Sequence, residues 1–98
     1  NAPLLPEEST LEQTYPNPFN PSTTIRYGLP EESDVSLIIY DIQGRMVKTF
    51  HTKYQKAGWY EQVVDGNTTS SKAMSTGIYF ARFVAGDYTK VIKMLYVK

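Results

Sequence analysis

The 98-residue sequence contains no cysteine, a single histidine and no long apolar run. Without cysteine the chain has no disulfide framework, no thiolate zinc site and no cysteine nucleophile. No apolar segment approaches the roughly 20 residues that a membrane-spanning helix needs. A chain of this length is expected to form one small domain whose apolar residues are needed for a single core, so little is left for a deep active-site pocket.

An excess of one charge is also missing, because ten basic residues balance ten acidic residues. This balance removes the usual electrostatic argument for a protein that binds nucleic acid or an anionic membrane. The charges are unevenly distributed, however. Residues 1–44 carry seven acidic residues and one basic residue, whereas residues 45–98 carry nine basic and three acidic residues. The two halves therefore have net charges of −6 and +6.

Motifs for catalysis are absent as well. The sequence has no G-x-S-x-G nucleophile elbow and no glycine-rich phosphate loop. His51 has no second histidine with which to form a metal site, and we expect it in a solvated loop. Asp41, Asp65 and Asp87 could offer oxygen ligands to calcium, but bonds to backbone amides of their own turns explain them more simply. The sequence thus predicts a domain that is not an enzyme and has no cofactor or metal.

Apolar residues alternate with period two, and glycines fall between the alternating runs, which favours short strands over helices. We expect strands at residues 23–29, 34–42, 45–50, 58–64, 77–84 and 88–97. Residues 34–42 are apolar on both faces and predict a strand at the centre of a sheet. Tight hairpin turns are predicted at residues 41–45 and at Gly86-Asp87.

This spacing of strands predicts an all-β fold, namely an immunoglobulin-like antiparallel β-sandwich of about seven strands. A small barrel is the alternative, because alternation does not distinguish the two closures. Residues 1–12 are rich in proline and acidic residues and have the composition of a linker, so we expect the domain to span residues 13–98. The chain begins with asparagine and carries no signal peptide, so we expect it to be a piece of a longer polypeptide.

Six ordered motifs carry a resemblance to a known family. They are Tyr15–Tyr27 (YPNPFNPSTTIRY), Val35–Arg45 (VSLIIYDIQGR), Ala57–Tyr60 (AGWY), Asp65–Asn67 (DGN), Ser75–Arg82 (STGIYFAR) and Lys93–Lys98 (KMLYVK). In this order they resemble the type A C-terminal sorting domains of the Bacteroidota type IX (Por) secretion system. One departure is Val64, which stands where many members carry tryptophan.

The resemblance implies a secretion signal that is not an enzyme. Such a domain folds in the periplasm, is recognised by the outer-membrane translocon, and is commonly removed by a sortase-like peptidase. The cargo is the N-terminal part of the same polypeptide and ends at the cell surface or outside the cell. Cleavage in the family tends to fall just ahead of the domain, which here is the linker before or near Leu11. Related immunoglobulin-like modules of the flagellar hook-capping type can occupy non-terminal positions, so this function requires the domain to be C-terminal in its parent.

Recognition needs an exposed surface on a rigid fold, and we expect it on the C-terminal hairpin and its charged end. The candidates are Lys90, Lys93, Met94 and Lys98. Alternation places Lys90, Met94 and Lys98 on one face of the last strand and Lys93 on the other. A competing interpretation is that lysines on a terminal edge strand deter edge-to-edge aggregation.

The other motif residues have first a structural interpretation. Prolines fix the lead-in to the sandwich, Phe19 plugs one end of it, and single glycines serve turns. These structural candidates are Pro16, Asn17, Pro18, Phe19, Gly44, Arg45, Asp65, Gly66, Gly77, Tyr79 and Gly86.

The aromatic residues leave a second function open, that of an accessory immunoglobulin-like module that binds carbohydrate or acts in adhesion. Several aromatic side chains on one exposed face could stack on sugar rings, whereas in a small sandwich they usually fill the core. The residues concerned are Tyr54, Trp59, Tyr60, Tyr88 and Tyr96.

Overall fold

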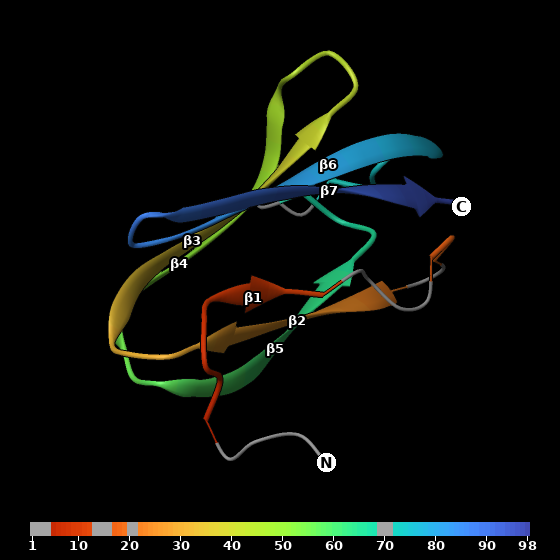
Figure 1. Cartoon of the computed structure of the whole chain (residues 1–98). Coiled ribbons are helices and arrows are strands. Elements are labelled where there is room, and N and C mark those ends of the chain that lie inside the picture. The colour runs from red at the N-terminus through yellow and green to blue at the C-terminus, as the bar shows by residue number, and fades with distance from the viewer. Residues whose placement is uncertain (1–4, 13–16, 20–21, 69–71) are drawn as a thin grey trace.

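The computed structural model describes residues 5–12, 17–19, 22–68 and 72–98. Seven strands form: β1 (Thr10–Leu11), β2 (Ser22–Leu29), β3 (Ser33–Asp41), β4 (Met46–Gln55), β5 (Gly58–Asp65), β6 (Gly77–Ala85) and β7 (Tyr88–Tyr96). They make two antiparallel sheets, sheet A in the order β1-β2-β5 and sheet B in the order β4-β3-β6-β7. The sheets face each other in Figure 1. The predicted sandwich is confirmed, and the barrel alternative is wrong because the described strands form two separate sheets.

Side chains that point inward from both sheets build one core. In β2 the residues Ile25, Tyr27 and Leu29 alternate inward, and in β3 Leu37 and Ile39 do the same. Burying one such aliphatic side chain contributes about 1.5–3 kcal/mol relative to leaving it exposed. The core therefore follows directly from the period-two pattern of the sequence.

The centre of sheet B is the strand that the sequence predicts there. Strand β3 lies between β4 and β6, and its outward residues Ile38 and Tyr40 are half-buried. Strand β3 joins β4, and β6 joins β7, through the predicted hairpin turns. At residues 41–45 the amide of Gly44 donates to the carbonyl oxygen of Asp41 at 3.0 Å, and Gly44 has a φ of 84°. Gly86 has a φ of 58° in the turn from β6 to β7.

Strand β4 is longer than predicted, since it runs to Gln55 rather than to residue 50. His51 therefore lies in a strand opposite Ser36, and the expectation of a loop is wrong. The residues after Phe50 are polar and do not show the apolar alternation of a strand. They form one nevertheless because β4 is the edge of its sheet, where polar side chains remain in water while the backbone pairs with β3.

The N-terminal segment also contributes to the sandwich. Thr10 and Leu11 pair with Gly28 and Tyr27 of β2, and Leu11 is buried. Further upstream, Pro6 packs so closely that a Cβ atom at Gly28 would lie 2.7 Å from its Cγ atom. Two residues with linker composition thus belong to sheet A, while the domain boundary after residue 12 stays a prediction. None of the described residues forms a helix long and apolar enough to cross a membrane.

Candidate recognition surface

Strand β7 carries the last sequence motif and lies at the edge of sheet B. Ile92, Met94 and Tyr96 point into the core, while Val91 and Lys93 point outward, as the alternation predicts. Met94 is completely buried, because the inward face of the strand makes it a core residue, and its side chain is not exposed for direct contact with a partner.

The segment 17–19 binds the outer edge of β7. The side chain of Asn17 accepts a hydrogen bond from the amide of Leu95 at 2.9 Å and donates one to the carbonyl oxygen of Lys93 at 3.2 Å. The amide of Phe19 donates to the carbonyl oxygen of Leu95 at 2.9 Å, and its own carbonyl accepts from the amide of Val97 at 3.1 Å. The C-terminal half of this edge is therefore paired within the chain.

Phe19 packs at one end of the sandwich, the place that the sequence analysis predicts for it. Its side chain is buried, and its ring centroid lies 5.0 Å from that of Tyr96. The peptide bond between Asn17 and Pro18 is cis. Pro16, the remaining candidate of this motif, lies outside the described residues.

Two further motifs meet the same end of β7. Gly66 lies against Tyr96, and Gly77 opens β6 opposite Tyr96. The amide of Lys98 donates to Thr76 Oγ1 at 2.9 Å. Motifs that are far apart in the sequence therefore converge on one place. We call it the C-terminal junction and define it by Asn17, Phe19, Gly66, Thr76, Tyr96 and Lys98.

The candidate lysines have different surroundings. Lys90 Nζ donates to the carbonyl oxygen of Leu11 at 3.0 Å, so this side chain fastens sheet B to strand β1. Lys93 and Lys98 are exposed. Of the four recognition candidates, these two are the exposed ones at the junction: Lys98 is part of it and Lys93 lies beside it.

Two tyrosine hydroxyls donate hydrogen bonds to the backbone just upstream of their own strands. Tyr79 donates to the carbonyl oxygen of Ser75 at 2.6 Å, and Tyr60 donates to that of Lys56 at 2.6 Å. Each acceptor lies four residues upstream, a geometry that resembles the tyrosine corner of immunoglobulin-like sandwiches. Burial raises the pKa of the Tyr79 hydroxyl, so it remains a donor at neutral pH.

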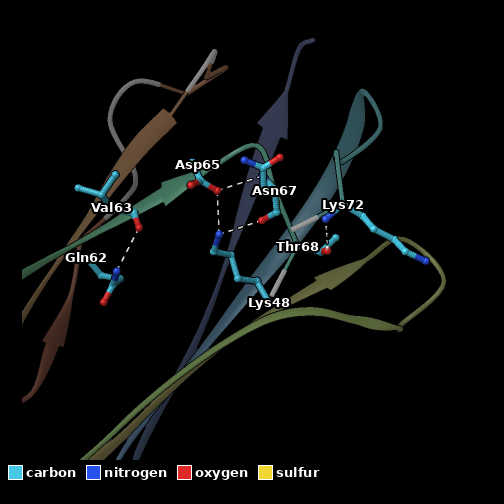
Figure 2. Close-up of polar contacts among 7 residues, drawn as sticks. All are labelled: Lys48, Gln62, Val63, Asp65, Asn67, Thr68 and Lys72. Atoms are coloured by element: carbon cyan, nitrogen blue, oxygen red, sulfur yellow. Dashed lines mark hydrogen bonds and ion pairs between the residues drawn. The ribbon is translucent and has the colours of Figure 1, made fainter. Parts of the chain in front are cut away.

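A lysine that the sequence analysis did not single out joins the two sheets. Lys48 Nζ of β4 donates to Asp65 Oδ1 and to the carbonyl oxygen of Asn67, both at 2.8 Å (Figure 2). The hydrogen bond from Lys48, followed by one from the amide of Asn67, holds the pKa of Asp65 below its ordinary value of 3.8. Figure 2 shows Lys72 pointing away from this group. The available signal was alternation in the expected strand at residues 45–50, which places Lys48 on the same face as Phe50, a residue that packs against the core.

Asp41 serves its own turn, as predicted. Its carboxylate accepts hydrogen bonds from the amides of Gln43 and Arg45 and from Arg45 Nε at 2.8 Å. The bond from the amide of Arg45 is the main cause that lowers the pKa of Asp41. Within the described part of the chain no three histidine, aspartate or glutamate side chains form a group that could hold a metal ion.

The aromatic side chains do not share one exposed face. Tyr96 is buried, and Tyr60 and Tyr88 pack against the core. Trp59 lies in sheet A beneath the guanidinium of Arg26, which is 4.3 Å from its ring centroid. Tyr54, 72% exposed, belongs to β4 of sheet B. Three of the five residues thus serve the core, and the other two lie on different sheets.

Solved structures with a similar fold include two from Porphyromonas gingivalis. Dimeric latent PorU matches with a TM-score of 0.73 and 23% identity, over 94% of this chain and 9% of that chain. PorZ, described as an essential surface component of the type-IX secretion system, matches with a TM-score of 0.62 and 17% identity, over 90% of this chain and 11% of that chain. This chain thus spans about a tenth of the length of either protein.

FlgD from P. aeruginosa also matches, with a TM-score of 0.58 and 20% identity, over 97% of this chain and 75% of that chain. At these identities the likeness is one of fold. No curated protein matches the chain in sequence.

The family comparison covers almost the whole sandwich. Residues 13–98 match the family described as the secretion system C-terminal sorting domain. The resemblance to type IX sorting domains that the six motifs carry is thereby confirmed. The chain belongs to the family of secretion system C-terminal sorting domains.

Proposed function

We propose that this domain is a sorting signal, without enzymatic activity, that directs an attached cargo protein across the outer membrane through the type IX secretion system. The observation that carries the proposal is the family match over residues 13–98. The convergence of four family motifs on the end of β7 supports it, because a signal read by a receptor needs a rigidly held surface.

The partners we propose are the outer-membrane translocon, which reads the C-terminal junction with Lys93 and Lys98, and a sortase-like peptidase. The cargo precedes Asn1 in the same polypeptide and passes through the periplasm to the cell surface or the medium. Leu11 is buried and paired with β2, whereas Glu7 and Glu8 are exposed. This difference supports cleavage upstream of Thr10.

The test is to fuse residues 1–98 to a periplasmic reporter in a host that has the type IX system. We expect the wild-type fusion to reach the surface, and a deletion of residues 94–98 to leave the reporter in the periplasm. Lys93→Glu with Lys98→Glu is expected to reduce surface reporter at least fivefold. Lys53→Glu with Lys56→Glu is the matched control, because both lysines are exposed and lie in or beside β4.

Two results would overturn the proposal. One is a wild-type fusion that stays in the periplasm, and the other is a deletion of residues 94–98 that reaches the surface as well as wild type. If the Lys93 and Lys98 variant is exported like its control, the two lysines are excluded from recognition, and the signal lies elsewhere on the fold.

A further inference from the structure

On strands β3, β6 and β7 the outer face of sheet B carries many apolar side chains, although the solvent-facing side of an antiparallel sheet is ordinarily polar. On β7 the outward residues Val91 and Leu95 are 53% and 37% exposed, and Val97, which follows the strand, is 42% exposed. The register of the sheet continues this surface across β6 and β3. We call it the outer patch and define it by Ile38, Ile78, Phe80, Val84, Val91 and Leu95. Ile78, Val91 and Leu95 are exposed, and Ile38, Phe80 and Val84 are half-buried. Apolar side chains gathered on a surface in this way mark interaction sites.

An exposed arginine lies at the centre of the outer patch. Arg82 on β6 stands opposite Ile38 on one side and Val91 on the other, between the outward residues Phe80 and Val84 of its own strand. None of the ion pairs among the described residues involves Arg82. Lys93, opposite Phe80, adds a second positive charge. The patch is therefore apolar and basic, without a carboxylate of its own at the centre.

We propose that the outer patch docks a partner protein that presents a carboxylate to Arg82 from within an apolar surface. A guanidinium binds a carboxylate through two parallel hydrogen bonds, and arginine is enriched among the residues that dominate protein interfaces. The surrounding aliphatic and aromatic side chains exclude water and strengthen that pair. The inference rests on the proposed function in that it takes the partner to be a component of the export machinery.

The position of Arg82 argues against two other occupants. A membrane would receive the centre of the patch deepest in its hydrocarbon, where a charged side chain is costly. A second copy bound through the same patch about a two-fold axis would bring Arg82 against Arg82, and like charges at an interface are unfavourable. Neither of these energetic costs applies to a partner protein with an acidic surface.

Export of the reporter fusion separates this inference from the proposed function. We expect Arg82→Glu to reduce surface reporter at least fivefold, Arg82→Lys to reduce it less, and the exposed control Lys56→Glu to leave it unchanged. Val91→Asp is a second variant in the patch. Melting temperatures of the purified variants identify any that fail to fold. If wild type is exported and folded Arg82→Glu and Val91→Asp are exported equally well, the inference is wrong and the proposed function stands.

Direct binding tests the patch without relying on export. The probe is a 12-residue peptide that alternates glutamate with leucine and phenylalanine, and its control carries glutamine in place of glutamate. In NMR titrations of the purified 98-residue chain we expect the glutamate peptide to shift the resonances of Arg82 Nε and of the backbone amides of the outward-facing residues of β7. The glutamine peptide should shift these resonances at least fivefold less.

Three results would overturn the inference in this experiment. The first is equal shifts with both peptides or none with either. The second is the same shifts on raising the concentration of the chain alone, which assigns the face to a second copy. The third is binding to anionic phosphatidylglycerol vesicles that Arg82→Glu abolishes, which assigns it to a membrane.

Discussion

At the scale of single residues, Gly66 shows how a close contact fixes a position that looks like a turn residue. Its φ is not in the left-handed region, unlike that of Gly44 or Gly86. A Cβ atom at Gly66 would instead overlap the hydroxyl oxygen of Tyr96 and lie 2.5 Å from its Cζ atom, and Tyr96 is itself buried. The glycine is therefore required by the approach of β7.

We expect Gly66→Ala to lower the free energy of unfolding by about 1–3 kcal/mol, because Tyr96 must move out of its packed position. Urea unfolding followed by tryptophan fluorescence measures the change. Tyr96→Phe removes the nearest atom, so Gly66→Ala should cost less in that background. An equal cost in both backgrounds would contradict the contact with Tyr96.

Asp65 gives a prediction for the dependence of stability on pH. Its pKa is lowered in the folded state, mainly by Lys48, so the stabilisation is complete above the ordinary value of 3.8 and is lost as the pH falls through the lower folded value. Asp65→Asn should therefore be less stable than wild type at pH 7 and equally stable near pH 2. The difference at pH 7 should be at most about 1 kcal/mol, because the Asp65 carboxylate is 54% exposed.

Urea unfolding at both pH values makes this comparison. Asp87→Asn is the control, since Asp87 takes part in no ion pair among the described residues. A loss of stability in Asp65→Asn that is the same at pH 2 and pH 7 would show that the Lys48 pair is not its cause.

At the scale of elements, the segment 17–19 is what closes the exposed edge of β7. Asn17→Ala removes both side-chain hydrogen bonds to that edge, at the amide of Leu95 and the carbonyl of Lys93. Two hydrogen bonds of this kind contribute about 1–3 kcal/mol together. We therefore expect amide hydrogen exchange at Leu95 to become about tenfold faster or more.

Gln43→Ala, in the exposed turn between β3 and β4, is the control for this measurement. It should leave exchange at Leu95 unchanged. If exchange at Leu95 in Asn17→Ala matches that of the control, the edge is protected by something other than Asn17.

The sequence predicted the strands themselves better than it predicted which strands lie side by side. The β6–β7 hairpin and the inward faces of its strands follow from Gly86-Asp87 and from alternation, and both are confirmed. Alternation says nothing about which strand lies beside which. The bond between Asn17 and Leu95 joins residues 78 positions apart, and no local pattern encodes it. Resemblance placed the motifs in order, but only the fold brings them together at the C-terminal junction.

At the scale of the whole molecule, the oppositely charged halves of the sequence do not form separate lobes. Sheet A combines β1 and β2 from the acidic half with β5 from the basic half, and sheet B combines β3 with β4, β6 and β7. Yet of the three ion pairs among the described residues only Arg45 with Asp41 joins the two halves. Arg82 and Lys93 of the basic half lie exposed on the surface of sheet B.

The fold also makes the end of the chain part of its core. Deleting residues 94–98 removes Met94 and Tyr96 from the interior and uncovers Phe19. Losses from buried side chains of this size are about 2–5 kcal/mol each, which together are comparable to the entire stability of a small domain. We expect the deletion to abolish cooperative unfolding, as followed by circular dichroism during heating.

Deletion of Lys98 on its own should keep the transition, since it removes an exposed residue and one hydrogen bond to Thr76. A cooperative transition near the wild-type midpoint in the chain that lacks residues 94–98 would contradict this account. If the deletion of residues 94–98 unfolds the domain, the loss of export that it causes reflects unfolding as much as a missing signal. The surface variants at Lys93, Lys98 and Arg82 then become the decisive ones, because they change charge on the recognition surface while leaving the core intact.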